Sequence, residues 1–600
     1  MKPLLIALFT LGLLNPPSTF AATPDNHPLW KSDKLPDLYY EILVKSVEQE
    51  MKLQAPDGRF RSHLPATPEQ DVRSLNMYIM EYIYAPALLY VADNPANTLR
   101  GDKKVLDMAL RAGDWLASIV DETGLFVPTV NGVKTSPLDS HRTLYCWAEA
   151  YGLLESHLGD KRRAAWREAL IRAGGKVADD LRERKNRPRY IAPFLGTSPN
   201  HFGLWATTVW RLGMILNKED WVSLAQPVLY RFVREVAPGG YWAEHDGPTM
   251  TYDYLNSSVA GLYWNYSGDP AALKAMRLST DFHTHWSTPD GVDIHTVDQR
   301  NRNHFEVEAS WGLFTFCYFP EGRRFVRFKL LSALGDSADP LRSFGLEALG
   351  RIAQDAYYHT EGGEARIPQE MNAYYHRIDR PAVVKKSGPW VYSMSALVSV
   401  PSPLNQFFLD RIDPISLWHA KTKHIIGGGN SKGQPELATF MVKRANGDRD
   451  CLPLDALITG NQDTDTMCVA LEGFSLRLVI TTVDSATVTI SASAEKTYDV
   501  PDSAFLNLPL IVSPGETIRT GSGESYSLGE TEIKLEGLAA LSYKNWRAEL
   551  PAGARFYWPY FTYTPYGPVR VPKNIHNAVA VVSIPLTDLS GWTTVHFRIE

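Results

Sequence analysis

The feature that most constrains the fold is a change in hydrophobic period near residue 388. From about residue 35 to 380, apolar residues recur at helical spacing, and short breaks rich in Gly, Pro, Asp and Asn separate the helical segments. After residue 388, apolar and polar residues alternate in β-branched runs that end at turn residues. The sequence therefore predicts a helical half followed by a half made of strands.

The helical half contains eleven expected helices in succession, which predict helical hairpins packed side by side. No fixed repeat length is visible, so a closed or nearly closed α/α toroid is favoured over an open repeat array. The expected helices cover residues 77–92, 104–120, 141–158, 161–183, 202–216, 221–236, 254–266, 271–286, 305–319, 323–334 and 341–357.

The second half predicts an antiparallel β-sandwich, because its short alternating runs are separated by frequent turn signals. We expect three parts: a signal peptide at 1–22, an α/α toroid at 23–387 and the sandwich at 388–600. Residues 358–386, with Gly362-Gly363 and two prolines, are expected to form a linker or a loop at the edge of a cleft.

The first residues resemble a secretory signal. Lys2 precedes an apolar run from Leu4 to Leu14, and small residues follow up to Ala22. No other segment has about 18 uninterrupted apolar residues, so we expect an exported protein of the periplasm or medium, without membrane insertion. Export permits disulfides, and Cys451 and Cys468 are either bridged or free.

The charge balance restricts the partners. The 61 Lys and Arg residues against 67 Asp and Glu residues give a net charge of −6. Such a chain has no overall cationic field, so nucleic acid is not an expected partner, and an anionic substrate requires a locally basic cleft. The chain is rich in aromatic residues, which can stack on sugar faces (16 Trp, 28 Tyr and 23 Phe).

Two polar stretches lead from a loop into an expected helix. Asn200-His201 lies in the first, and the second, Gly239 to Tyr254, holds Glu244, His245, Asp246, Tyr252 and Tyr254. Their polar side chains should lie at helix N-termini on one rim of the toroid, where functional residues are common. Asn200 has a second interpretation as a helix cap.

A metal site is not expected. His283 and His285 are two residues apart on an expected helix and point about 200° apart, so they cannot share one ion.

The chain resembles the polysaccharide lyases built from an α/α toroid and a β-sandwich. The similarity is carried by Asn200-His201, the turn Gly240 to Pro248, the nine-residue spacing from His245 to Tyr254, and Arg300-Asn301-Arg302. These lyases include the chondroitin AC and hyaluronate lyase group and the heparinase II/III and oligoalginate lyase group. The resemblance implies a catalytic Asn, His and Tyr from the toroid and a further His from the sandwich, either His419 or His424. The usual Asp-Gly-Ser-Phe is replaced by Gly239-Gly240-Tyr241-Trp242, so no substrate is transferred.

The residue types also fit β-elimination at a uronic acid. The sugar carboxylate must be neutralised before C5 loses its proton, and Asn200, His201, His245 and Arg300 are the expected donors. Tyr254 is the expected proton carrier, with nearby cations lowering its pKa. Tyr252 competes for this role, since only one of the two can face the cleft. No metal or organic cofactor is needed. We expect substrate contacts from Tyr252, Trp205, Trp242, Glu244, Arg302, His419 and His424.

Two other functions stay open. A glycoside hydrolase on a similar toroid would use two carboxylates drawn from Glu244, Asp246, Glu306 and Glu308. A non-catalytic glycan-binding protein is the second. For the lyase, the expected partner is an anionic uronate-containing polysaccharide or oligosaccharide, with the uronic acid, its sulfation and the oligomeric state left open.

Overall fold

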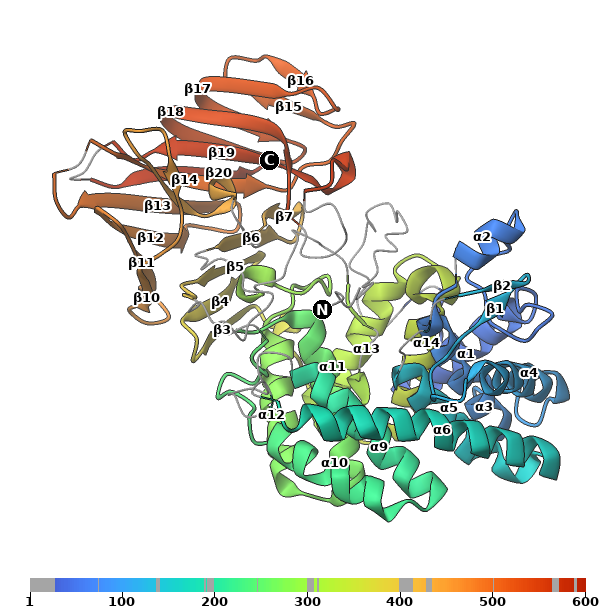
Figure 1. The fold of residues 1–600 in the computed structure, drawn as a ribbon. Helices are drawn as coiled ribbons and strands as arrows, with labels where there is room; N and C mark the ends of the chain where they lie inside the picture. The colour runs from blue at the N-terminus through green and yellow to red at the C-terminus, as the bar shows by residue number, and fades with distance from the viewer. Residues whose placement is uncertain are drawn as a thin grey trace.

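The fold was obtained as a computed structural model with a helical half and a strand half (Figure 1). The structure describes residues 27, 29–73, 75–135, 137, 141–187, 190, 199–244, 247–298, 307–309, 312–398, 414–427, 434–499, 501–563, 571–587 and 591–600. Helices fill the described chain up to Tyr358 and strands fill most of it from Ala373 onward. This arrangement confirms the predicted fold class.

The helices begin and end at residues with clear local reasons. The Asp269 side chain accepts from the backbone N–H of Ala271 at 2.9 Å and caps α12, whereas Gly268, at φ 66°, ends α11 in the left-handed region. The helices are α1 Leu35–Glu50, α2 Pro68–Arg73, η1 Met77–Ile83, α3 Tyr84–Val91, α4 Lys103–Ile119, α5 His141–Leu154, η2 Glu155–His157, α6 Asp160–Arg184, α9 Pro199–Leu216, α10 Glu219–Phe232, α11 Met250–Ser267, α12 Pro270–His285, η3 His295–Val297, η4 Leu313–Tyr318, α13 Pro320–Leu334 and α14 Pro340–Tyr358.

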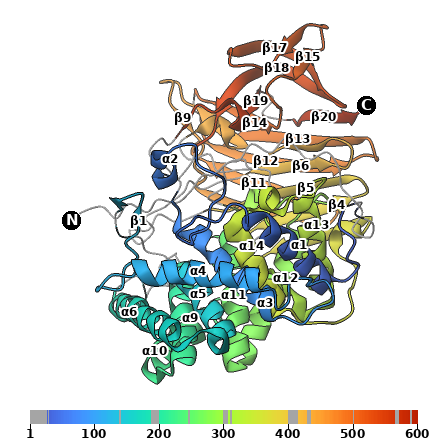
Figure 2. The same cartoon turned by 90° about the vertical axis from the view of Figure 1, so that its right-hand side faces the viewer.

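The helical ring closes on itself, because α1 packs against α14 (Figures 1 and 2). The segment before α1 contributes to the closure: the Trp30 Nε1–H donates to the carbonyl of Ser337 at 3.0 Å. Buried apolar residues from α1 through α14 form one continuous core. The predicted closed or nearly closed toroid is therefore confirmed.

One expected helix is wrong. Residues 305–319 were expected to be helical, but in the part of this range that the structure describes, 307–309 have no regular structure and 313–318 form the 3₁₀ turn η4. Gly312 adopts φ 59° immediately before η4, which interrupts an α-helix. In the other direction, α1 was not among the expected helices.

The strands of the second half are all joined by antiparallel pairing. They are β3 Ala373–Ile378, β4 Ala382–Ser387, β5 Trp390–Ser395, β6 Ile415–His419, β7 Lys423–Ile426, β8 Phe440–Lys443, β9 Arg449–Asp450, β10 Asp455–Thr459, β11 Thr466–Leu471, β12 Phe474–Thr482, β13 Thr487–Lys496, β14 Ser503–Leu510, β15 Thr517–Thr520, β16 Ser525–Ser527, β17 Ile533–Tyr543, β18 Trp546–Phe561, β19 Ala578–Pro585 and β20 Thr593–Ile599, and a small hairpin in the helical half adds β1 Thr129–Val130 and β2 Val133–Lys134.

The long strand β18 belongs to both layers of the sandwich. Its first residues, from Trp546 to Glu549, pair with β20, while Arg555 to Phe561 pair with β19. Strands β10 to β13 extend the layer of β20, and strands β3 to β7 join the layer of β19 through β14. Alternate residues of β12 and β13 are buried between the layers, as the period-two pattern predicts.

The strand half begins earlier than expected. Strands β3 and β4 pair with each other and with β5 in the same sheet, although 358–386 was expected to be a linker or a loop at the edge of a cleft and the sandwich to begin at 388. The charged residues at the end of β4 conceal the strand pattern. Lys386 is nevertheless buried, because its Nζ donates to the carbonyl of Gln369 at 2.6 Å.

Strands β5 and β6 are buried along their whole length, because both faces of each strand are covered by other parts of the protein. One face joins the sandwich core. The other joins a separate apolar cluster in which Trp286 and Phe282 of α12 pack against Val391 of β5 and Trp418 of β6. This cluster fixes the sandwich against the end of the toroid that carries the polar stretches.

All four cysteines have free thiols, so the suggested Cys451–Cys468 bridge is not formed. In the part of the chain that the structure describes, no helix combines the length and the apolar character needed to cross a bilayer.

Candidate active site

The two polar stretches meet at the start of α9 and in the loop before α11. The backbone N–H of Asn200 donates to Glu244 Oε1 at 3.4 Å. Glu244 itself belongs to a tight turn, in which its backbone exchanges hydrogen bonds with Gly247 at 2.8 and 3.1 Å. The Asn200 segment and the Glu244 segment are therefore in contact.

Two buried carboxyl groups fix the start of α11. Asp253 Oδ1 accepts from the backbone N–H of Trp242 at 2.8 Å, and Asp298 Oδ2 accepts from that of Met250 at 2.9 Å. Burial raises the pKa of Asp253 well above its usual range, and the nearby charges of Glu244 and Asp298 raise it further. Sequence analysis missed the role of Asp253 and Asp298, since their partners are distant in sequence.

The sandwich contributes His424 of β7 to the same rim. Burial lowers the pKa of the His424 imidazole to about 4, Asp290 opposes this effect, and His295 adds to it. His295 in turn lies with its Nδ1 3.9 Å from Asp298 Oδ2, next to the start of α11. The structure therefore brings His424 to the toroid rim as a neutral imidazole.

Tyr254 does not have the position expected of a proton carrier. Its side chain is fully buried, and its hydroxyl donates to Asp293 Oδ1 at 3.0 Å. Its ring stacks on His283, with 3.9 Å between ring centroids. Burial raises the pKa of Tyr254 well above its ordinary value, and Asp293 raises it further. This position contradicts the assignment of Tyr254 as catalytic phenol, because its hydroxyl is buried and bound to Asp293.

Tyr252 is the alternative of the pair. It lies in the first turn of α11 and is half-buried, whereas Tyr254 points into the core. Two residues along a helix turn the side chain by about 200°, which places the two phenols on different faces. The positive end of the helix dipole favours a negatively charged group at this turn.

The two expected tryptophan platforms do not offer a free ring face. Trp242 is fully buried, stacks on Phe232 with ring centroids 5.2 Å apart, and donates from Nε1 to the Phe232 carbonyl. Trp205 is 7% exposed, and the Arg184 guanidinium covers its ring at 3.9 Å. Both belong to the packing of the toroid rather than to a sugar-stacking surface.

Two further expected contacts have structural roles. His419 is buried within the sandwich, where its Nδ1 accepts from the backbone of Lys421 and its ring packs on Trp390. Glu244 is 1% exposed and serves as the acceptor for the Asn200 backbone. These placements correct the expectation that either side chain faces the cleft.

His201, in contrast, is half-buried and lies against Trp205, with ring centroids 5.5 Å apart. The expected residues His245, Arg300 and Arg302 lie outside the described residues, as do Asp246 and Glu306 of the hydrolase alternative.

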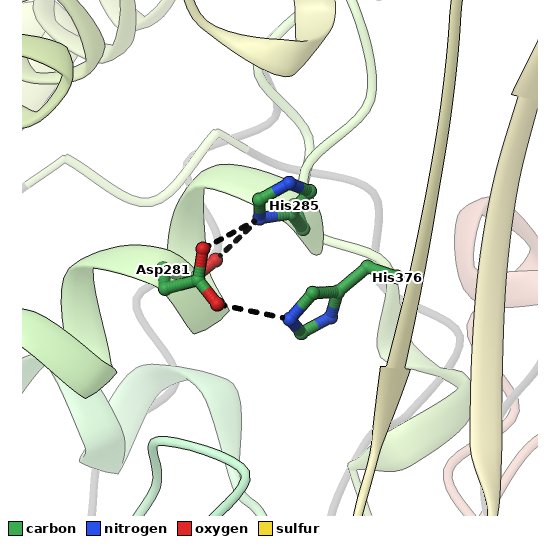
Figure 3. A group of neighbouring side chains, drawn as sticks. All are labelled: Asp281, His285 and His376. Carbon is green, nitrogen blue, oxygen red and sulfur yellow. Dashed lines mark hydrogen bonds and ion pairs between the residues drawn. The ribbon is translucent and has the colours of Figure 1, made fainter.

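One group in the described chain has side chains that could hold a metal ion: Asp281 and His285 of α12 with His376 of β3 (Figure 3). Each of its three side chains forms a hydrogen bond without an ion. The Trp286 Nε1–H donates to His376 Nδ1 at 3.1 Å, so the other ring nitrogen, Nε2, carries the proton and donates to Asp281 Oδ2 at 3.2 Å.

The ring geometry agrees with this proton arrangement. The two imidazoles are stacked at 4.4 Å with 12° between their planes, so a single ion cannot lie in both ring planes. His285 Nδ1 faces the carbonyl of Asp281 at 2.7 Å, which assigns a proton to that nitrogen too. The group is an Asp–His–His hydrogen-bond network between the toroid and the sandwich.

Comparisons with known proteins found no matching family model and no matching curated protein. Among solved structures, xanthan lyase from Paenibacillus is similar at 11% identity and a TM-score of 0.48, over 96% of this chain and 58% of that one. The chain thus spans less than two thirds of the length of that lyase.

Two other similar structures have closer lengths. Chondroitin AC lyase from Streptomyces coelicolor shows 13% identity and a TM-score of 0.47, over 95% of this chain and 80% of that one. Heparan sulfate lyase from Pedobacter heparinus shows 11% identity and a TM-score of 0.44, over 97% and 85%. All three names are those of polysaccharide lyases, the class that the sequence resembles. At these identities and TM-scores the likeness decides neither activity nor substrate.

Proposed function

We propose that this chain is an exported polysaccharide lyase that cleaves a uronate-containing glycan by β-elimination. The observation that supports the proposal is that the start of α9, the start of α11 and strand β7 each carry one polar side chain suited to this chemistry. Asn200 begins α9, Tyr252 occupies the first turn of α11, and His424 lies on β7 of the sandwich. An amide, a phenol and a neutral imidazole are the groups that this elimination requires.

The amide of Asn200 is suited to bind the uronate carboxylate. The side chain is 4% exposed, and within the described residues its Oδ1 has no hydrogen-bond partner. Its NH₂ group, together with His201, would donate to the carboxylate oxygens most strongly when negative charge develops on them during loss of the C5 proton.

Tyr252 would act as the proton carrier. Its phenolate takes the proton from C5, the electron pair of the C5–H bond forms the C4=C5 double bond, and the C4–O4 bond breaks. The proton then passes to O4 of the leaving sugar, from Tyr252 or from His424. Both protons and electrons balance without an oxidant, a metal or a co-substrate. The hydrolase alternative is less favoured, because Glu244, one of its candidate carboxylates, is buried against Asn200.

The test compares Tyr252→Phe with Tyr254→Phe. A screen of alginate, glucuronan, ulvan and glycosaminoglycans, followed by the ultraviolet absorbance of the C4=C5 bond, would identify a polymer that the natural chain cleaves. Tyr252→Phe should then lower kcat by at least about 100-fold with little change in substrate affinity, since only the transition state uses the phenolic proton.

Tyr254→Phe is the matched control. It should retain kcat within a few fold, although it loses a buried hydrogen bond to a carboxylate and about 1–3 kcal/mol of unfolding free energy. Product that appears as reducing ends without ultraviolet absorbance would refute elimination. Near-normal turnover of Tyr252→Phe would remove Tyr252 from the mechanism.

A further inference from the structure

Residues from three helices meet around Trp205, close to Asn200 and His201. Trp205 lies one turn after His201 on α9, and its ring is 5.5 Å from that of His201. Arg184, the last residue of α6, covers the indole at 3.9 Å. His141, the first residue of α5, meets the same indole edge to face, with 6.2 Å between ring centroids and 74° between the ring planes.

The start of α5 is fixed in this position. The Thr208 hydroxyl of α9 donates to the backbone carbonyl of His141 at 3.2 Å. The neighbouring Arg142 donates to buried Glu81, which fixes the next residue of α5 as well. The backbone and the ring plane of His141 are therefore held by the protein, while its ring nitrogens are not used in doing so.

The imidazole of His141 is 9% exposed, and within the described residues neither of its ring nitrogens has a hydrogen-bond partner. Native proteins rarely leave a buried polar group unpaired, and such groups are typical of sites that bind a ligand. The Oδ1 atom of Asn200 is a second buried polar atom in the same state. These two residues lie at the starts of α5 and α9, two helices that pack against each other.

The charge state of His141 identifies the kind of group it can bind. Burial, together with the charges of Arg142 and Arg184 and against the opposing charge of Glu81, lowers the pKa of this imidazole to about 3. The ring is thus neutral and offers one N–H donor and one nitrogen acceptor. A hydroxyl group, which both donates and accepts, matches that pair better than a carboxylate, which only accepts.

We infer that His141 determines glycan specificity by hydrogen-bonding a hydroxyl of the sugar bound beside Asn200 and His201. The inference rests on the proposed function, because it places a glycan at this rim. It predicts that His141 contributes to substrate binding and takes no part in proton transfer.

The experiment uses His141→Phe, which keeps a ring beside Trp205 and removes both nitrogens. His141→Asn and His141→Gln are the rescue variants, since their amides supply a donor and an acceptor near the positions of Nδ1 and Nε2. His157→Phe, an exposed position in η2 beyond the other end of α5, is the matched control. Kinetics are followed by ultraviolet absorbance. Affinity is measured by calorimetric titration of the intact substrate polymer into the same variants, each carrying Tyr252→Phe as well.

His141→Phe should raise KM and Kd by at least about tenfold with kcat nearly unchanged, because a lost binding contact weakens ground state and transition state alike. Its Tm should not fall, and one of the two amide variants should recover most of the affinity. His157→Phe should match the natural chain. Unchanged KM and Kd in His141→Phe would overturn the inference. It would also be overturned if both amide variants lost as much affinity as His141→Phe and had a lower Tm.

The two proposals fail separately. If the natural chain binds a uronate polymer without producing the double bond, the proposed elimination is wrong, while the titrations still decide whether His141 binds the glycan. If cleavage occurs and His141→Phe binds normally, only the role of His141 is lost.

Discussion

At the scale of single residues, the buried group around Asp293 explains why Tyr254 belongs to the core. Lys329 Nζ lies 2.9 Å from Asp293 Oδ1, and both side chains are at most 1% exposed. Ser287 and Tyr254 also donate to Asp293 Oδ1. Lys329 further donates to the Gly291 carbonyl at 2.8 Å, so that each charge has several partners.

Breaking this pair should be costly. Lys329→Met leaves Asp293 buried without its counter-charge, and we expect it to lower the free energy of unfolding by about 3–5 kcal/mol in urea titrations. Lys534→Met is the control, since its pair with Glu532 is exposed at 59% and 68% and should change stability by less than about 1 kcal/mol. Equal effects of the two substitutions would contradict a structural role for Asp293 and Lys329.

The choice between Tyr252 and Tyr254 shows what the sequence can predict at this scale. Helical geometry alone predicts that only one of the two phenols faces the cleft. The one that faces inward is selected by Asp293 and Lys329, which are 39 and 75 residues further along the chain than Tyr254. No local spacing carries that information, and the resemblance in spacing favoured the wrong residue.

At the scale of elements, α1 and α14, which pack against each other, each carry one buried carboxyl group. Glu50 ends α1 and accepts from the Arg61 backbone at 3.1 Å, and Asp355 of α14 accepts from that of Phe314 at 3.0 Å. Within the described chain, the second oxygen of each has no partner. Burial raises the pKa of each carboxyl to about 8.

These two acids should make stability depend on pH. Between the ordinary carboxyl pKa and about 8, the unfolded chain releases a proton that the folded chain keeps, so unfolding becomes easier as pH rises. The stability that the two protonated carboxyl groups contribute is fully present below the ordinary carboxyl pKa, and it is lost by about pH 8. We expect Glu50→Gln with Asp355→Asn to reduce the loss of stability from pH 5 to pH 8 by more than about 1.4 kcal/mol, measured by urea unfolding. The exposed substitution Glu48→Gln on α1 should leave the slope unchanged, and an unaltered slope in the double variant would refute this account.

Most elements could be predicted because their apolar residues follow a single period. Helices α4, α6 and α12 begin and end within a few residues of the expected ranges. Strands β12, β13 and β19 likewise lie close to the alternating runs at 474–483, 486–493 and 578–584, from which strands are expected. Strands β3 and β4 were missed for the opposite reason. They are covered by the toroid on one face, and Lys386 reaches a buried carbonyl, so burial there follows tertiary contacts rather than alternation.

At the scale of the whole molecule, the toroid and the sandwich are joined by an apolar cluster and by polar bonds around it. Tyr374 of β3 donates to the His285 carbonyl at 3.2 Å, and Thr296 shares a 2.7 Å hydrogen bond with Ser393 of β5. The Asp281–His285–His376 network lies beside them (Figure 3). This junction holds His424 over the toroid, so the proposed site depends on both halves.

Removing His376 should loosen the junction. His376→Ala deprives the Trp286 Nε1–H of its acceptor and Asp281 of a donor, which should cost about 1–3 kcal/mol of unfolding free energy. Hydrogen exchange should accelerate in β3 and at the end of α12 before it does elsewhere, as mass spectrometry can show. His576→Ala, at an exposed position of η7, is the control and should change neither quantity. Exchange rates in β3 equal to those of the unaltered chain would refute the role of the network.

The double membership of β18 has a consequence for how the strand half comes apart. Because one continuous strand supplies partners to β20 in one layer and to β19 in the other, detaching it exposes open edges in both layers at once. The layers therefore cannot peel away one after the other. Under force or on heating, the strand half should therefore unfold in one cooperative transition, because β18 joins its two layers.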